Sequence, residues 1–361
     1  METSIQAQTG IVASAKKNSW LYLTSPETTW LLDGLLPADG FSLICGKPKA
    51  GKSTWIRSLV AAVIKTSRFL GRSVDIPEGT GKVLYLHLDQ KDKLHRVAEE
   101  LRQLGITTEE EADRVILLEA KDIPKEYTFA ERLTWLQQQV KEAKPNLLVI
   151  DLLWLFLKVK SANDYNAVVE GMNQVHTALD EAGYKGATLV AVHGRKAVNP
   201  DNPADDILGS TGQSGSCVTT IMLSRRRREG IYTIMTEQTV RDKVYGEIDE
   251  TVIHRSETGV LSLGTRVDQI KAEEAKAKDS NDIQRLLMFI KDNSGSDIET
   301  IRAELHMSKN RALELIDKTA LIRHEGDGVK GDPKRYFVDA VDPATELFAR
   351  FGNKGGSNDI N

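Results

Sequence analysis

The clearest chemistry in this chain lies at residues 46–53. They read Gly-Lys-Pro-Lys-Ala-Gly-Lys-Ser, which has the spacing of a phosphate-binding P-loop. In such a loop, backbone N–H groups and the positive end of the following helix surround a triphosphate. We expect Lys52 to reach the β- and γ-phosphates and Ser53 to hold Mg²⁺. The predicted nucleotide-binding residues are Gly46, Lys47, Pro48, Lys49, Ala50, Gly51, Lys52, Ser53 and Thr54.

The residues around this loop have the secondary structure that a P-loop needs. Residues 41–45 are a short apolar run typical of a buried strand, and residues 53–64 have a helical pattern. A strand, a glycine-rich turn and a helix therefore follow one another, and the sequence predicts binding of ATP with Mg²⁺.

Asp151 is the candidate for a second Mg²⁺ contact. Residues 146–151 form an apolar run that ends in this aspartate, the Walker B form in which the carboxylate holds the metal directly or through water. The alternative is that Asp151 only caps the next helix. Ligands in open α/β sheets bind at the carboxyl ends of strands, which favours the metal role.

Two more polar residues stand at the ends of apolar runs. Asp89 follows the run at 83–88, where a carboxylate could orient or deprotonate an attacking water. It could instead cap a helix at 91–104. His193 ends the run at 188–193 and could sense the γ-phosphate, or it could be a hydrogen-bonded structural histidine. His87 alternates inward, and we expect it in the core.

The elements that must position these residues alternate along the chain. Short Val-, Leu- and Ile-rich runs occur at 83–88, 115–118, 147–151 and 188–193, with helical patterns between them. This alternation predicts an α/β fold with a mainly parallel, doubly wound sheet. Strand-like segments at 217–224, 231–238, 245–254 and 258–263 should add antiparallel strands at the edge of that sheet.

Composition sets limits on the class of protein. The formal net charge of −4 gives no global sign of a nucleic-acid binder, so such a surface must be local. Cys45 and Cys217 are the only cysteines, which excludes a disulfide framework or a cysteine-rich zinc site and suits the cytoplasm. No stretch of about 18 apolar residues exists, so we expect no membrane segment. No signal peptide is visible.

The sequence predicts five segments. Residues 1–18 are expected to be a disordered N-terminus, 19–263 an ATPase domain, 264–281 a charged linker or exposed helix, 282–340 a small winged-helix domain, and 341–361 a flexible tail. Three helical patterns followed by two strands around a turn-rich segment predict the winged helix. Residues 281–338 hold ten lysines or arginines and ten acidic residues, so this domain could bind DNA or dock on a replication or regulatory protein.

With these residues in place, the chain resembles RecA-like P-loop ATPases. More narrowly, it resembles the AAA_25 group that includes plasmid RepA-type hexameric replicative helicases. The resemblance covers roughly residues 20–263. It is carried by Trp-Leu-Leu-Asp-Gly-Leu-Leu at 30–36, the P-loop, Tyr-Leu-His-Leu-Asp at 85–89, Val-Ile-Asp at 149–151, Val-His-Gly-Arg-Lys at 192–196 and Ile-Leu-Gly-Ser-Thr-Gly at 207–212. The family usually has glutamate where this chain has Asp89, and often two histidines where it has Val192 and His193.

The resemblance implies a homo-oligomer, with a hexameric ring expected and ATP between neighbours. One subunit would supply Lys52, Asp89, Asp151 and His193, and the next a basic finger, for which Arg241 and Lys243 are candidates. Loops at 158–163 and 194–215 would face a central channel that holds single-stranded DNA. Their candidate phosphate contacts are Lys158, Lys160, Arg195 and Lys196.

Three functions remain open at this point. The first is a replicative DNA helicase, the second an ATP-dependent switch or loader without unwinding activity, and the third a recombination or repair ATPase. The four arginines at 225–228 are read as a solvated hairpin turn, with a DNA or subunit contact as the alternative.

Overall fold

Short aliphatic runs form the strands at the centre of the N-terminal part of this protein. The computed structural model describes residues 28–76, 81–89, 93–159, 165–193, 217–226, 230–238 and 246–339. The chain divides into two units, the first ending at Arg266 and the second beginning at Val267. Each unit is described separately below.

A nine-stranded sheet is the centre of the first unit. Its strands are β3 (Gly40–Gly46), β4 (Val83–His87), β5 (Val115–Glu119), β6 (Leu147–Asp151), β7 (Ala187–His193), β8 (Thr219–Arg226), β9 (Ile231–Gln238), β10 (Thr251–Arg255) and β11 (Leu261–Arg266). The spatial order is β11-β10-β9-β8-β3-β7-β6-β4-β5. The prediction of a doubly wound, mainly parallel sheet is confirmed.

The direction of one strand differs from the prediction. The run at 217–224 was expected to be antiparallel, but β8 pairs with β3 in parallel, with Ser42 opposite Thr219. On its other side β8 is antiparallel to β9, and β10 and β11 continue the antiparallel pairing. An alternation of apolar and polar residues looks the same in a parallel and in an antiparallel strand. The connection between two strands, and not their residues, sets their relative direction.

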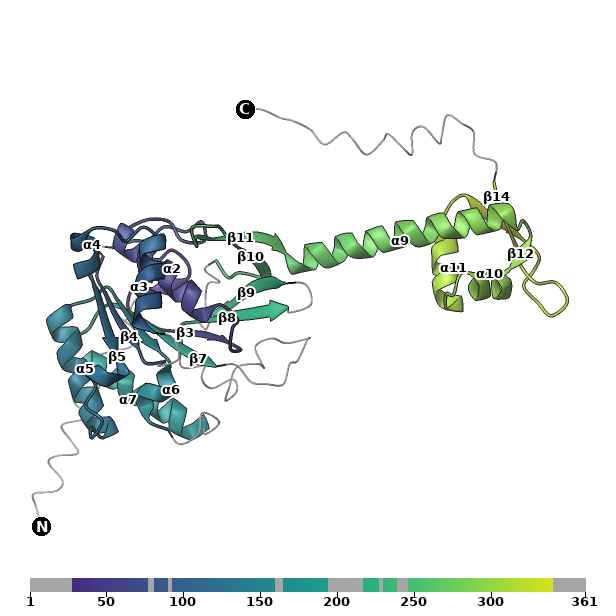
Figure 1. The fold of residues 1–361 in the computed structure, drawn as a ribbon. Coiled ribbons are helices and arrows are strands. Elements are labelled where there is room, and N and C mark those ends of the chain that lie inside the picture. Colours follow the sequence, from purple (N-terminus) through teal and green to yellow (C-terminus); the bar gives the residue numbers. More distant parts are fainter. Residues whose placement is uncertain are drawn as a thin grey trace, which may run out of the picture. The chain divides into compact units, whose positions relative to one another are not determined.

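Helices cover both faces of this sheet (Figure 1). On one face lie α2 (Lys52–Lys65), α3 (Leu94–Gln103) and α4 (Glu109–Asp113), and on the other α5 (Phe129–Ala143), α6 (Leu153–Leu157) and α7 (Tyr165–Glu181). The remaining elements are η2 (Ala120–Asp122) and the short pair β1 (Trp30–Leu32) and β2 (Leu36–Pro37). This layering is what the alternation of strands and helices predicts.

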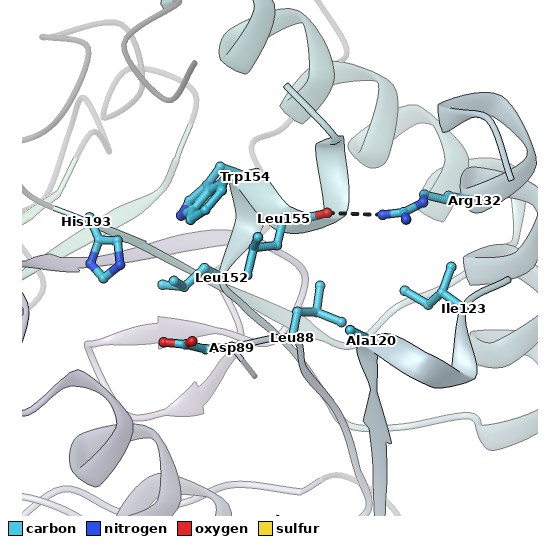
Figure 2. A pocket seen from close by; sticks show the side chains of 9 residues that line it. All are labelled: Leu88, Asp89, Ala120, Ile123, Arg132, Leu152, Trp154, Leu155 and His193. Atoms are coloured by element: carbon cyan, nitrogen blue, oxygen red, sulfur yellow. Dashed lines mark hydrogen bonds between the residues drawn. The ribbon is translucent and has the colours of Figure 1, made fainter. Parts of the chain in front are cut away.

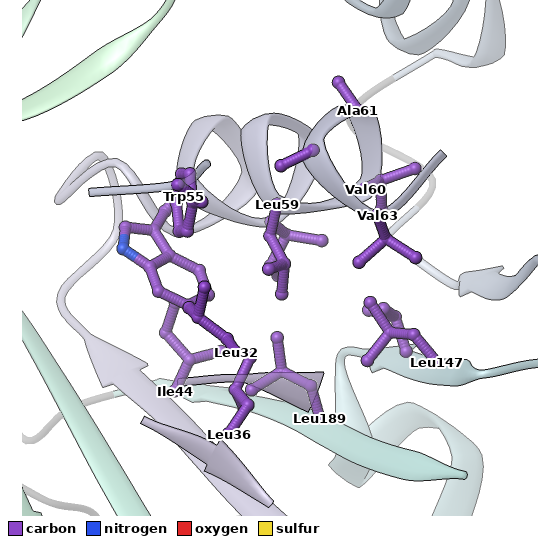
Figure 3. Close-up of a cluster of buried hydrophobic side chains, with 14 of the residues drawn as sticks. Leu32, Leu36, Ile44, Trp55, Leu59, Val60, Ala61, Val63, Leu147 and Leu189 are labelled. Carbon is purple, nitrogen blue, oxygen red and sulfur yellow. The ribbon is translucent and has the colours of Figure 1, made fainter. Parts of the chain in front are cut away.

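The helix after the P-loop is held by an apolar core. Leu59 and Val63 of α2 are fully buried and point toward the sheet, where Leu147 and Leu189 lie (Figure 3). Trp55 is also fully buried and meets Phe69 edge-on, with ring centroids 4.9 Å apart. Each such side chain contributes about 1.5–3 kcal/mol by leaving water. Packing therefore fixes α2 and, with it, the loop at its N-terminus.

The second unit is small and has its own core. Its elements are α9 (Val267–Asp292), β12 (Ser296–Asp297), α10 (Ile298–Glu304), α11 (Lys309–Asp317), β13 (Ile322–Glu325) and β14 (Arg335–Val338). The core residues are Leu286, Ile290, Ile301, Leu305, Ala312, Leu315, Ile316 and Tyr336. Residues 264–281, predicted as a linker or exposed helix, form the end of β11 and the first half of α9.

In the part of the chain that the structure describes, no helix is both long enough and apolar enough to cross a membrane.

We predict that the second unit depends on the cap of α10. Asp297 accepts a 2.8 Å hydrogen bond from the backbone N–H of Thr300, and this bond lowers the pKa of Asp297. Asp297→Ala should destabilise α10 by about 1 kcal/mol, whereas Asp297→Asn, which keeps an accepting oxygen, should cost less. Hydrogen exchange of the α10 amides measures this.

The pH dependence follows from the lowered pKa. The charged form of Asp297 contributes its stability above the pKa of the unfolded chain, and that stability is lost as pH falls through the lower folded value. The exchange difference between wild type and Asp297→Ala should therefore shrink in acid. A difference that stayed constant there would contradict this account of the cap.

Candidate functional site

The candidate site lies at the carboxyl ends of four adjacent strands. The parallel register places Gly46 of β3 opposite His193 of β7, and Asp151 of β6 opposite Ala191 of β7. Asp151 also lies opposite His87 at the end of β4. The residues therefore lie together at the carboxyl edge of the sheet. Ligands in open α/β sheets bind at this edge. Asp89 follows β4 by two residues.

The P-loop lysine is folded into its own loop. The Lys52 Nζ donates to the Gly46 carbonyl at 2.6 Å and to the Lys47 carbonyl at 3.3 Å. It also lies 3.3 Å from Nδ1 of His193, which accepts when its ring proton is on Nε2. The structure therefore brings together the P-loop lysine and the histidine that were predicted separately.

The electrostatics of Lys52 suit an anion. Burial lowers the pKa of the Lys52 ammonium, and the carboxylates of Asp151 and Asp89 oppose that shift. A polyphosphate would add negative charge beside a buried cation and stabilise it. The pKa of Lys52 also shows that both predicted carboxylates are close enough to influence it.

The loop geometry requires its glycines. Gly46 has φ of 156°, and a Cβ there would overlap the carbonyl oxygen of Leu223. Gly51 has φ of 98°, in the left-handed region, and it forms the N-cap of α2 without a side-chain cap. By contrast, Thr128 caps α5 with its side chain in a capping box. The backbone N–H groups at the start of α2 have no side-chain cap and are oriented to bind an anion.

The Walker B aspartate is held by a chain of buried groups. The hydroxyl of Tyr85 on β4 donates to Oδ2 of Asp151 at 3.0 Å. Arg57 of α2 also hydrogen-bonds Tyr85, and its Nη1 donates to Glu100 of α3 at 2.8 Å. Burial raises the pKa of Asp151, while the bond from Tyr85 lowers it. Tyr85 therefore helps to keep this buried carboxyl ionised, the form that binds Mg²⁺.

Mg²⁺ at this site would take ligands from a nucleotide and water as well as from the protein. Among the described residues, no group of three His, Cys, Asp or Glu side chains could hold an ion. Mg²⁺ typically takes one or two carboxylates together with phosphate oxygens and waters. Ser53 and Asp151 beside a P-loop fit this pattern. Phosphate oxygens of the nucleotide and waters would supply the remaining ligands of the metal.

Asp89 and His193 line one cavity of about 420 Å³ (Figure 2). Its full lining is Leu88, Asp89, Ala120, Ile123, Arg132, Leu152, Trp154, Leu155 and His193. None of the P-loop residues is among them. The cavity thus begins at the two predicted catalytic residues and extends away from the P-loop.

The remaining predicted residues divide into two groups. Lys158 is described, and its Nζ donates to the carbonyls of Lys125 at 2.9 Å and Tyr127 at 2.7 Å. The others lie outside the described residues, namely Lys160, Arg195, Lys196, Arg241 and Lys243. His87 is buried, as expected. Of the arginines at 225–228, the first two are on β8 rather than in a turn, and Arg225 lies over the ring of Tyr232; the other two lie outside the described residues.

Sequence reasoning missed several residues that support the site. Tyr85 and Arg57 lie on predicted elements, and only the pairing of β4 with β6 shows what they contact. Arg132 lay in a helical pattern and Trp154 in the apolar run around Asp151, and neither was singled out. A charged residue amid the buried positions of α2, as at Arg57, was the one available signal.

Comparisons with known proteins place this geometry in a family. The family model described as AAA domain, AAA_25, matches residues 15–199, just over half of the chain. A search of curated proteins gave no match. Among solved structures, a KaiC-like protein from Pyrococcus horikoshii OT3 aligns over 65% of this chain and 94% of its own, with 13% identity and a TM-score of 0.46. On the extent of the family match, together with its P-loop, this chain belongs to the AAA_25 family of AAA-domain ATPases.

Proposed function

We propose that this protein is a ring-forming, Mg²⁺-dependent ATPase motor that acts on single-stranded DNA, as a replicative helicase of the plasmid RepA type. The observation that carries the ATP-hydrolysing part is the contact between Lys52 and His193. Asp151 pairs with the strand position two residues before His193, so all three side chains belong to the same edge of the sheet. The DNA and ring parts rest on the resemblance of the motif set to that group.

Each residue has a defined part in this proposal. Lys52 neutralises charge on the β- and γ-phosphates, and Ser53 and Asp151 hold Mg²⁺. Asp89 orients the attacking water and accepts its proton. His193, which contacts Lys52, relays the loss of the γ-phosphate to the chain that follows β7 in this proposal.

The assembly is part of the same proposal. A neighbouring subunit in a homohexameric ring would supply Arg241 or Lys243 to the transferred phosphoryl group. Lys158, Lys160, Arg195 and Lys196 would contact the phosphates of DNA in the channel. Of these, Lys158 must first release the two backbone carbonyls that it binds.

We propose a winged helix for the second unit. Its α9, α10 and α11 are followed by the antiparallel pair β13 and β14, with β12 pairing β14. This is the element order of that motif, and α11 would be the recognition helix.

The ion pairs of α11 favour a protein partner for this unit. Arg311 donates to Asp279 at 2.5 Å and to Asp282 at 3.0 Å, and Lys318 pairs with Asp279 and Glu314. Intramolecular carboxylates therefore already neutralise these two cations. The same observation supports the second candidate function, an ATP-dependent switch or loader that binds a replication or regulatory protein.

The proposed function predicts a rate of ATP hydrolysis that depends on Lys52 and rises when single-stranded DNA is added. Wild type should hydrolyse ATP faster with single-stranded DNA and should separate the strands of a forked duplex. Lys52→Ala should abolish both, because the phosphates lose their buried cation. Lys65→Ala, at the far end of α2, is the control and should keep both activities. ATPase without any strand separation would favour the switch.

Asp89→Asn should keep nucleotide binding but lose turnover by about 10²-fold or more, because an amide cannot accept the proton from water. A fluorescent ATP analogue measures binding, and phosphate release measures turnover. Asp113→Asn, at the end of α4, is the matched control. Turnover at the wild-type rate in Asp89→Asn would place the hydrolytic base elsewhere.

Tyr85→Phe should weaken the binding of Mg²⁺ at the site. Removing the hydroxyl raises the pKa of Asp151 further, so the concentration of Mg²⁺ at half-maximal ATPase should rise about tenfold, and more at lower pH. Tyr184→Phe makes the same chemical change at another buried hydroxyl, which donates to the Ala187 carbonyl at the opposite end of β7. If both variants changed the Mg²⁺ response equally, Tyr85 would have no specific part.

A further inference from the structure

The cavity beside Asp89 and His193 has features that ATP hydrolysis does not use. Its volume of about 420 Å³ falls in the range of small-molecule sites. Most of its wall is apolar, formed by Leu88, Ala120, Ile123, Leu152 and Leu155. A cavity that only admitted a water to the γ-phosphate would need neither this size nor this lining.

Arg132 contributes a buried positive charge to the cavity. Arg132 as a whole is only 9% exposed. Nη1 donates to the carbonyls of Leu155 at 3.0 Å and Phe156 at 3.1 Å, but the buried Nε has no hydrogen-bond partner within the described residues. Burial lowers the pKa of this guanidinium, and among the described residues no charged neighbour offsets that effect. A buried cation without a counterion is costly, and an anion would remove that cost.

Trp154 contributes a second unused donor. Its indole Nε1 is buried and also has no partner in the described part of the chain. In Figure 2, Trp154 and His193 lie toward one end of the cavity and Arg132 toward the other, with leucine side chains between them. Both donor atoms are themselves buried, so a ligand with an apolar body and hydrogen-bond acceptors would reach them through small rotations of the two side chains.

A purely structural role explains part of this arrangement. The Nη1 bonds of Arg132 satisfy carbonyls near the C-terminal end of α6, where a cation is favourable. That role leaves unexplained the unpartnered Nε, the unpartnered Trp154 Nε1 and the space between them. Buried donors in folded proteins nearly always have partners, so both point to a missing one.

We infer that this cavity is a binding site for an aromatic or otherwise apolar carboxylate. The carboxylate pairs with Arg132, and the apolar body lies along Leu152 and Leu155. Because Asp89 and His193 line the same cavity, an occupant changes their solvation and slows ATP turnover. This regulatory consequence rests on the proposed hydrolytic role of Asp89, whereas the binding itself does not.

The test uses 1-naphthaleneacetate and its uncharged analogue 1-naphthaleneacetamide with the full chain and no nucleotide. Calorimetry should show the acid binding at least tenfold more tightly than the amide. Arg132→Gln should remove that preference, and Arg302→Gln, an exposed arginine of α10, should leave it unchanged. Equal binding of acid and amide by wild type, or an unchanged preference in Arg132→Gln, would overturn the inference.

Two further variants test the site through other lining residues, so the test does not depend on whether Arg132→Gln folds. Trp154→Phe keeps an aromatic side chain but removes the N–H, and it should weaken binding of the acid several-fold. Ala120→Phe fills the cavity and should abolish binding of both compounds. Unchanged binding in Ala120→Phe would place the ligand elsewhere and overturn the site. Thermal unfolding confirms that each variant is folded.

A second arm measures ATPase. The acid should slow turnover of wild type but not of Arg132→Gln, and turnover unaffected by bound acid would overturn the regulatory consequence. Absence of ATPase in wild type itself would contradict the proposed function and leave the calorimetric result standing. The two failures are therefore distinguishable.

Discussion

The register of the parallel strands is the constraint on which the site depends. Gly46, His193 and Asp151 come from three strands far apart in sequence, and they meet because β3, β7 and β6 pair in one fixed alignment. A slip of one residue would turn every side chain of a strand to the other face. The apolar runs are buried on both faces by helices, so such a slip would expose core residues, and the core therefore enforces the register.

The same burial that fixes the register sets the electrostatics. It lowers the pKa of Lys52 and raises the pKa of Asp151, so each group is less strongly charged than it would be in water. Their mutual attraction and the bond from Tyr85 oppose those shifts. The site thus keeps its charges by pairing them, and a nucleotide with Mg²⁺ adds charges of the opposite sign to both.

The fold class and the core of the site could be predicted because their signals are local. The P-loop is a contiguous motif, and Asp151 directly follows the apolar run of its own strand. Tyr85, Arg57, Arg132 and Trp154 could not be assigned, because their partners lie on other elements. The direction of β8 was predicted incorrectly for a related reason, since a strand's residues do not encode which way its neighbour runs.

One edge of the sheet therefore carries two environments that share a boundary. The P-loop side is built from backbone N–H groups, Lys52 and Ser53, and it suits a polyphosphate. The other side is an apolar cavity with a buried guanidinium at its far end. Asp89 and His193 belong to the cavity lining, yet one influences Lys52 electrostatically and the other contacts it. An occupant of the cavity would displace water from around the Asp89 carboxylate, which lines the same space. The hydrolytic base that we propose at Asp89 would therefore be open to control from the cavity without any movement of the P-loop.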